Sequence, residues 1–256
     1  MEKGLVSIIT PMYKGAAFVG ETIESVLKQT YPNWEMIIVD DCSPDDGAGI
    51  NVVKQYKDSR IKLIESKVNK GSSGARNIAL REARGQYIAF LDSDDTWFSV
   101  YLERQIKFML DGGYSLVFSS RRRIQELGND DIYKPFIVPD KISYSELLKR
   151  CPIFISTTLY DRAKCGLFYF NEDLGSLRDD WVYWLAILKK IGIAYGNREI
   201  LGNYRIRGGS ATSNKWKVMV SQWRVLRSVE KLRYFNALYC FFSWLIFGMT
   251  KYRKFN

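Results

Sequence analysis

Residues 85–95 read GQYIAFLDSDD, an apolar run that ends in three clustered carboxylates, Asp92, Asp94 and Asp95. The run is short, continuously apolar and bounded by turn-forming residues, which predicts a buried strand. Like charges this close together repel one another, so water, a metal ion, or a metal ion carrying a substrate must compensate them. The stretch therefore predicts a strand whose carboxyl end carries either a solvated turn or a metal site.

Apolar runs of strand type alternate with runs of helical periodicity on both sides of this stretch. Strands are predicted at 5–10, 34–40, 61–65, 85–92 and 115–120. Helices are predicted at 18–30, 48–57, 72–83 (with N-cap serines) and 100–110. This alternation, with short links, predicts an α/β fold: a mostly parallel sheet with helices on both faces. Ligands of such sheets bind outside the carboxyl ends of the strands, where Pro11, Tyr13, Asp40 and Asp41 also lie.

The pattern weakens after residue 120. The sequence there predicts a hairpin at 121–131, a short helix at 144–150, an amphipathic helix at 177–190 and a basic loop at 204–213. No repeat or low-complexity linker separates the halves, so the second half is expected to pack on the first. We divide the chain into residues 1–120, residues 121–215 and a C-terminal helical extension, 216–256.

Composition limits the chemistry and the partners. The chain of 256 residues has a net charge of +10, which favours an anionic partner: nucleic acid, a membrane surface or a phosphorylated small molecule. It contains no histidine, so carboxylates must carry out any proton transfer. Its four cysteines show no CxxC spacing and are typical of reduced thiols in a cytosolic protein. Neither a signal peptide nor a membrane-spanning run is expected.

The DSDD stretch is compatible with two interpretations. In a turn, the carboxylates of Asp92 and Asp94 can both reach one ion, and oxygen-only ligands suit Mg²⁺ or Mn²⁺. Such an ion keeps coordination positions for substrate phosphates. Alternatively, the acids form a turn with a helix N-cap, with Asp95 or Ser99 as the capping residue. The residue types alone leave both interpretations open.

Several segments together resemble the family 2 glycosyltransferases, which have the GT-A fold. The segments are VSIITPMY (6–13), SVLKQTYPNWEMIIVDDCSPD (25–45), NKGSSGARNIALREARGQYIAFLDSDD (69–95) and RDDWVYWL (178–185). Their order and spacing match the family over about residues 4–210. The likeness is greatest to bacterial surface-polysaccharide enzymes, including the teichuronic acid type. It implies a GT-A, Rossmann-like sheet and inverting transfer of a sugar from a UDP-sugar.

The resemblance implies a nucleotide site in the first 120 residues. Pro11 and Tyr13 would hold the base, with Tyr13 stacking on uracil. Asp41 would accept the uracil N–H while Asp40 supports the turn. Arg76 would approach the base, with Gly71 and Gly74 giving room. The alternatives are ordinary packing of Tyr13, an Asx turn at Asp40 and an exposed arginine at a helix start. The family commonly has asparagine where this chain has Lys14.

The resemblance also implies the reacting groups. Asp92 would lie near the ribose, Asp94 would bind Mn²⁺ or Mg²⁺ on the diphosphate, and Asp95 would support the loop. Asp180, the second acid of the RDD segment, would be the general base in residues 121–215. Alternatively, Asp179 and Asp180 only complement a helix N-terminus.

The basic loop and the C-terminal segment carry further expectations. Arg205 and Arg207, and more weakly Ser210, are candidates for diphosphate contacts, or else belong to a solvated basic loop. Residues 234–249 are apolar and aromatic with basic flanks, which suits a helix in the interface of an anionic membrane. A helix docked on the core or a contact with a second subunit are the alternatives.

The expected partners are a UDP-sugar, a saccharide or lipid-linked acceptor and, through residues 234–254, the inner face of the cell membrane. No nucleic acid partner is expected for such an enzyme. The alternative function is a non-catalytic basic binding protein for nucleic acid or anionic lipid.

Overall fold

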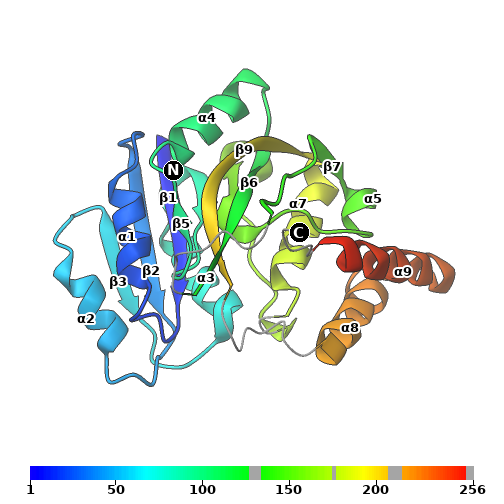
Figure 1. Cartoon of the computed structure of the whole chain (residues 1–256), viewed down its shortest axis with the longest axis horizontal. Helices are drawn as coiled ribbons and strands as arrows, with labels where there is room; N and C mark the ends of the chain where they lie inside the picture. The colour runs from blue at the N-terminus through cyan, green and yellow to red at the C-terminus, as the bar shows by residue number, and fades with distance from the viewer. Residues whose placement is uncertain (127–133, 175–176, 207–214, 252–256) are drawn as a thin grey trace.

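The computed structural model describes residues 1–126, 134–174, 177–206 and 215–251. Within them, one nine-stranded sheet has the spatial order β3-β2-β1-β4-β8-β6-β9-β5, and β7 pairs with β9 (Figure 1). The strands are β1 Glu2–Met12, β2 Trp34–Asp40, β3 Ile61–Glu65, β4 Gly85–Phe90, β5 Thr96–Trp97, β6 Leu116–Gln125, β7 Lys141–Ser143, β8 Thr158–Asp161 and β9 Ile193–Ile206. All five predicted strands are confirmed, with small differences at their ends.

The parallel part of the sheet places the candidate residues. Strand β2 pairs in parallel with one side of β1 and β4 with the other, and β3 pairs in parallel with β2. Because these strands run in one direction, their carboxyl ends meet at one edge. The chain order reverses at β1, which has β2 on one side and β4 on the other. Such a switch point is where α/β sheets bind ligands.

Helices cover both faces of this sheet. One face carries α1 Val19–Leu27, α2 Ala48–Gln55 and α4 Tyr101–Asp111, and the other carries α3 Gly71–Glu82 and α7 Asp179–Ile191, with the short helices α5 Tyr144–Leu147 and α6 Arg162–Cys165. Alternation along β1 explains the two layers: Ile8 joins the apolar cluster under α1, α2 and α4, and Ile9 joins the cluster under α3 and α7. The predicted α/β fold is confirmed.

The sheet becomes mixed beyond β4. Strand β8 lies antiparallel between β4 and β6, and β9 pairs in parallel with β6. The predicted basic loop at 204–213 is wrong at its start, because Tyr204, Arg205 and Ile206 pair with β6 as the end of β9. Instead of a hairpin beginning at Arg121, β6 runs on to Gln125, and one antiparallel bridge joins Arg121 to Phe136. The rest of the predicted hairpin, 127–131, lies outside the described residues.

The C-terminal extension comprises α8 Lys215–Arg224, a π-helical segment Val225–Val229 and α9 Tyr234–Lys251. Both helices extend from one end of the body (Figure 1). Ala237 and Cys240 of α9 are buried against the cluster that contains α7, while Phe235 is 81% exposed. Among the described helices, none combines the length and apolarity that crossing a bilayer requires. All four cysteines are free thiols.

Candidate active site

The DSDD segment forms a compact turn directly after β4. The Asp95 N–H donates to the Asp92 carbonyl at 3.0 Å, and the Asp92 N–H donates to the Ser156 hydroxyl at 3.2 Å. Helix α4 begins after Val100 without a side-chain cap, so neither Asp95 nor Ser99 serves as one. The three carboxylates therefore take their places from the turn itself and from its distant partners.

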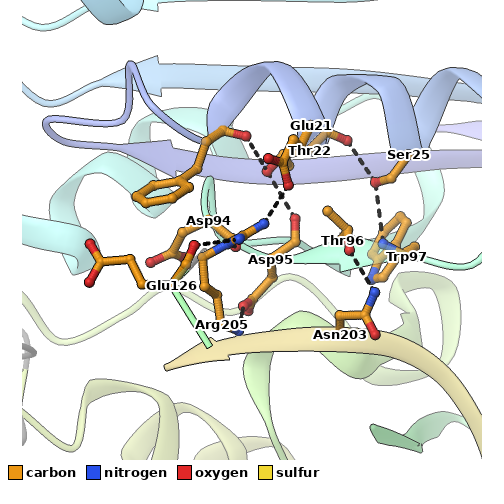
Figure 2. Close-up of polar contacts among 11 residues, drawn as sticks. Glu21, Thr22, Ser25, Asp94, Asp95, Thr96, Trp97, Glu126, Asn203 and Arg205 are labelled. Carbon is orange, nitrogen blue, oxygen red and sulfur yellow. Dashed lines mark hydrogen bonds and ion pairs between the residues drawn. The ribbon is translucent and has the colours of Figure 1, made fainter. Parts of the chain in front are cut away.

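Asp95 is buried beneath this turn. Its carboxylate accepts the Ser156 hydroxyl at 2.5 Å and the Arg205 backbone N–H at 3.0 Å. Burial, together with the charges of Asp94 and Asp92, raises the pKa of Asp95 well above its usual range. These contacts confirm that Asp95 supports the loop. The short strand β5 continues from here, held to β9 (Figure 2).

Arg76 joins two acidic segments. Its guanidinium is buried and donates to Asp92 at 2.6 Å and to Asp179 at 3.0 Å. Burial by itself would lower the pKa of Arg76, but the charges of Asp92 and Asp179 outweigh it and raise the pKa. Among the described residues its Nε has no hydrogen-bond acceptor. The alternative of an exposed arginine at a helix start is thus wrong.

Asp179 is held by the start of α3. Besides Arg76, its carboxylate accepts the hydroxyls of Ser72 at 3.1 Å and Ser73 at 3.0 Å. The sequence predicts these serines as N-caps, but α3 begins at Gly71 after Lys70, and no side chain caps it. The serines instead tie α3 to α7, which fixes the first turn of α7 at the carboxyl edge of the sheet.

Asp180 follows in the same turn of α7. One carboxylate oxygen accepts the Trp181 N–H at 2.7 Å. Burial, then the charge of Asp179, raises the pKa of Asp180, and the nearby Arg178 opposes that rise. A carboxylate whose pKa is raised toward neutrality is better suited to take up a proton than an ordinary aspartate. The structure thus brings Asp180 near Arg76, which contacts the preceding residue, Asp179.

The aromatic residues of α7 explain why its acids lie there. Phe90, the last residue of β4, packs edge-on against Tyr183 and Trp184 at centroid distances of 5.5 and 5.7 Å. Phe170 stacks on Tyr183 at 4.1 Å. Burying these rings anchors α7 under β4, since large aromatic side chains dominate core energetics. The helix consequently begins beside the DSDD turn.

On the other side of the switch point, two turns carry the predicted nucleotide residues. The Asp41 N–H donates to the Met12 carbonyl at 2.8 Å, and the Lys14 N–H donates to the Ser43 hydroxyl at 2.9 Å. These bonds hold together the turns that contain Tyr13 and Asp41. Tyr13 is 46% exposed, so it is not packed as a core residue.

Asp40 and Asp41 have different partners. Both carboxylate oxygens of Asp40 bind Ser43, at 2.7 and 3.1 Å, which confirms its support of the turn. Asp41 accepts the Lys70 N–H at 2.8 Å with one oxygen. Burial raises the pKa of Asp41, and the Asp40 charge adds to this, although the Lys70 N–H opposes it. Pro11 lies in β1 opposite Val39, with Met12 between it and the turn.

Left-handed backbone marks three of these turns. Lys14, Cys42 and Arg178 have φ of 52°, 55° and 67°. Lys14 and Cys42 adjoin the predicted site residues Tyr13 and Asp41, and Arg178 lies two residues before the predicted base, Asp180. Side chains other than glycine and asparagine rarely adopt this conformation, and such strain concentrates at functional sites. The conformation also explains why asparagine suits the position of Lys14.

Arg205 has protein partners on every guanidinium nitrogen. Nε donates to the Asp94 carbonyl at 3.0 Å, and the two terminal nitrogens donate to the Glu126 carbonyl at 2.8 Å and the Glu21 carboxylate at 2.5 Å (Figure 2). The side chain is buried rather than part of a solvated basic loop. Its predicted diphosphate contact stays a prediction. Arg207 and Ser210 lie outside the described residues.

The site fits a hard divalent cation. Its side chains offer oxygen ligands, which suit Mg²⁺ or Mn²⁺. Asp94, which the resemblance predicts as the metal ligand, lies in this turn between Asp92, which contacts Arg76, and Asp95, which contacts Ser156. No group of three or more acidic or cysteine side chains able to hold a metal occurs in the described parts of the chain. Water and substrate phosphates would have to complete the coordination, as is common for Mg²⁺.

The chain matches a known protein family over most of its length. The model of the family described as glycosyl transferase family 2 matches residues 7–170. The chain belongs to this family, and its sheet has the GT-A fold. The predicted resemblance is therefore confirmed.

Particular relatives are similar over nearly their whole length. TuaG of Bacillus subtilis (strain 168), a glycosyltransferase whose name assigns it to teichuronic acid biosynthesis, is 39% identical over 241 residues, covering 93% of this chain and 94% of TuaG. WfgD of Escherichia coli, a UDP-Glc:alpha-D-GlcNAc-diphosphoundecaprenol beta-1,3-glucosyltransferase, is 38% identical over 253 residues, covering 98% and 96%.

Solved structures share the fold at low identity. Staphylococcus aureus TarS 1-349 in complex with UDP-GlcNAc has a TM-score of 0.68 at 19% identity, covering 94% of this chain and 71% of that one. The mannosyltransferase PcManGT of Pyrobaculum calidifontis, in complex with GDP-Man and Mn²⁺, has a TM-score of 0.69 at 19% identity, covering 96% and 70%.

Proposed function

We propose that this protein is an inverting glycosyltransferase that moves a sugar from a UDP-sugar to a hydroxyl of a bacterial surface polysaccharide or lipid-linked saccharide. Family membership supports the reaction class. The single observation that carries the specific proposal is the bridge made by Arg76, which contacts Asp92 of the DSDD turn and Asp179 beside Asp180. It supports the proposal because it brings the DSDD turn and the start of α7 together at the carboxyl edge of the sheet.

The donor would bind across the switch point. The exposed ring of Tyr13 can stack on uracil, and the second oxygen of Asp41 can accept the uracil N–H. Pro11 would shape the start of this turn. Arg76 would approach the base, which its Nε supports because this nitrogen has no acceptor among the described residues. Asp92 would face the ribose, and Arg207 is the proposed diphosphate contact. Residues 1–120 would thus form the nucleotide-sugar half.

The reaction would be a single displacement. Asp180 takes the proton from the acceptor hydroxyl as its oxygen attacks the anomeric carbon from the face opposite UDP. The carbon–oxygen bond to the diphosphate then breaks, UDP leaves, and the anomeric configuration inverts. Mn²⁺ or Mg²⁺, bound through Asp94, would supply Lewis-acid neutralisation of the charge on the diphosphate. Residues 121–215, which contain Asp180, would form the acceptor half.

The names of relatives support the proposed acceptor, and the C-terminal helices support the proposed location. Two relatives act on a diphosphoundecaprenol-linked saccharide by name. In α9, Phe235, Tyr239, Phe242 and Ile246 are exposed at helical spacing, and Lys149 and Arg178 lie against the rings of Tyr239 and Trp244. Exposed aromatics with cations suit the interface of an anionic membrane. We therefore place the enzyme at the cytoplasmic face of the cell membrane, in cell-envelope polysaccharide biosynthesis.

A thermal-shift panel tests the proposal. The protein is heated with UDP-, GDP- and dTDP-sugars, each with and without Mn²⁺, and wild type is compared with Asp94→Ala. We expect UDP-sugars with Mn²⁺ to raise the midpoint most, and this gain to vanish in Asp94→Ala. Binding raises the midpoint because the ligand binds only the folded chain. Salt-sensitive DNA binding without any UDP effect would instead favour the non-catalytic basic binder.

A further inference from the structure

Polar side chains of α1 contact the main chain at the end of the DSDD turn. The Thr22 hydroxyl donates to the Asp95 carbonyl at 2.9 Å, and the Ser25 hydroxyl accepts the Trp97 N–H at 3.2 Å. Gln29, which follows the C-terminus of α1, donates its amide to the Phe98 carbonyl at 2.9 Å. The main chain from Asp95 to Trp97 is therefore fixed to α1 (Figure 2).

The main chain of Asp94 is held by β9 rather than by α1. Arg205 of β9 donates Nε to the Asp94 carbonyl at 3.0 Å, while its own backbone N–H donates to the Asp95 carboxylate at 3.0 Å. Its far end forms an ion pair at 2.5 Å with Glu21, one residue before Thr22 on α1. The buried guanidinium of Arg205 thus connects β9, the candidate metal ligand and α1 (Figure 2).

We propose that Arg205 is a positioning residue for Asp94 and that Glu21 orients it. Arg205 is 3% exposed, and its three guanidinium nitrogens each donate to a protein oxygen. Its guanidinium also lies 4.8 Å from the ring of Phe18, which restricts it further. A planar guanidinium held in this way sets the direction of the Asp94 main chain, and hence of the Asp94 carboxylate toward a cation.

This positioning role of Arg205 differs from phosphate binding. An arginine that binds a diphosphate must turn donors toward the ligand, whereas Arg205 uses them on Asp94, Glu126 and Glu21. Lysine cannot replace it, because a single ammonium group cannot reproduce the fixed fork of donors. Outer partners of metal ligands typically affect metal affinity by about 10–100-fold.

Calorimetry of UDP binding with and without Mn²⁺ tests this, and the test rests on the proposed function. The variants are Arg205→Lys, the milder Glu21→Gln and the control Arg162→Lys. Arg162 also donates to a backbone carbonyl, that of Ala83 at 2.7 Å, but at the start of β4 rather than its end. Thermal unfolding without ligand is measured in parallel.

We expect Arg205→Lys to weaken UDP binding in Mn²⁺ by about tenfold or more. Metal-free UDP binding should change less than about twofold, since only the cation ligand moves. Glu21→Gln should show the same pattern more weakly. Because the Glu21 side chain is 61% exposed, we expect this variant to fold even if Arg205→Lys is unstable. Arg162→Lys should match wild type in both measurements.

Three outcomes would overturn the inference. Equal losses with and without Mn²⁺ in Arg205→Lys would make Arg205 a diphosphate contact. Unchanged Mn²⁺-dependent binding with a lower unfolding temperature would make it a structural residue only. Absence of UDP binding in the wild type would overturn the proposed function itself, which separates that failure from the other two.

Discussion

Asp92 and Asp179 accept hydrogen bonds from the same guanidinium, that of Arg76, at 2.6 and 3.0 Å. One residue lies at the end of β4 and the other begins α7, so a single buried cation joins the two acidic segments of the site. Without Arg76 these carboxylates would repel each other in a buried place, at a cost that exceeds that of exposed charges. The Arg76 guanidinium therefore holds the DSDD turn and the first turn of α7 next to each other.

Replacing Asp94 should remove the metal dependence. Asp94→Ala deletes the principal candidate ligand, so we expect a loss of about 10²–10³-fold in UDP-sugar turnover and loss of Mn²⁺-dependent UDP binding. Turnover is measured as UDP release at several Mn²⁺ concentrations. The control is Asp111→Ala, an exposed acid at the end of α4 that pairs with Lys107. Full activity of Asp94→Ala in Mn²⁺ would show that the metal site is elsewhere.

Asp180→Asn should separate binding from chemistry. The amide keeps the size of the side chain and can still accept the Trp181 N–H, but it cannot take up a proton. We expect transfer to fall by about 10²–10⁴-fold with UDP binding retained. Asp173→Asn, a nearby exposed acid, is the control. If Asp180→Asn lost UDP binding as well, its role would be structural.

The pH dependence of transfer should respond to Arg178. The base acts only when ionised, and the Asp180 pKa is raised by burial and by Asp179 but held down by Arg178. Arg178→Asn removes that cation and suits the left-handed backbone. The acid limb of kcat/KM should therefore move to higher pH. The control, exposed Arg104→Gln, should leave the acid limb at the same pH. If Arg178→Asn also left the acid limb at the same pH, this would argue against Asp180 as the base.

Stability should depend on pH through Asp95. Its raised pKa means that the folded protein binds a proton more readily than the unfolded chain. The free energy of unfolding therefore falls as pH rises from about 4, the usual aspartate value, toward neutrality. Asp95→Asn removes this dependence. The free energy of unfolding of Asp95→Asn minus that of wild type should therefore be more positive near pH 7 than near pH 4.5. Urea unfolding at both pH values measures it; an equal difference at the two would contradict the prediction.

The exposed side of α9 should bind anionic vesicles. Replacing Phe235, Tyr239 and Phe242 with serine removes aromatic surface available to the interface, so co-sedimentation should weaken roughly tenfold or more. UDP binding should be unchanged, and added salt should weaken the wild type. A control variant replaces Val68 and Leu110, two equally exposed apolar residues on the body. Equal losses in both variants would exclude α9 as a specific contact.

Much of the fold was predictable because its signals are local. Strand β2 and strand β3 have the bounds that their apolar runs predict, and the acids of the DSDD stretch follow β4 as expected. Parallel alternation then requires that Tyr13, Asp41 and Asp92 follow strands whose ends meet at one edge. Apolar periodicity and turn chemistry lie in adjacent residues, so the sequence carries them directly.

Other features were missed because distant residues decide them. Strand β9 contains Arg205 and Tyr204, polar residues that look like a loop until β6 pairs with them. Strand propensity depends strongly on such neighbours. Ser156 offered no signal as a partner of Asp95, and Glu21 offered only its place near a helix start.

The order of apolar runs and motifs along the chain was enough to predict which acids follow the parallel strands and which family the chain resembles. Only the tertiary structure decided how those acids are partnered: Asp95 buried under Ser156, Asp179 on the serines of α3, and Arg76 between two segments. The reason is physical. Strand and helix periodicity is written into neighbouring side chains, whereas the partner of a buried charge is whichever group the folded chain brings within hydrogen-bonding distance.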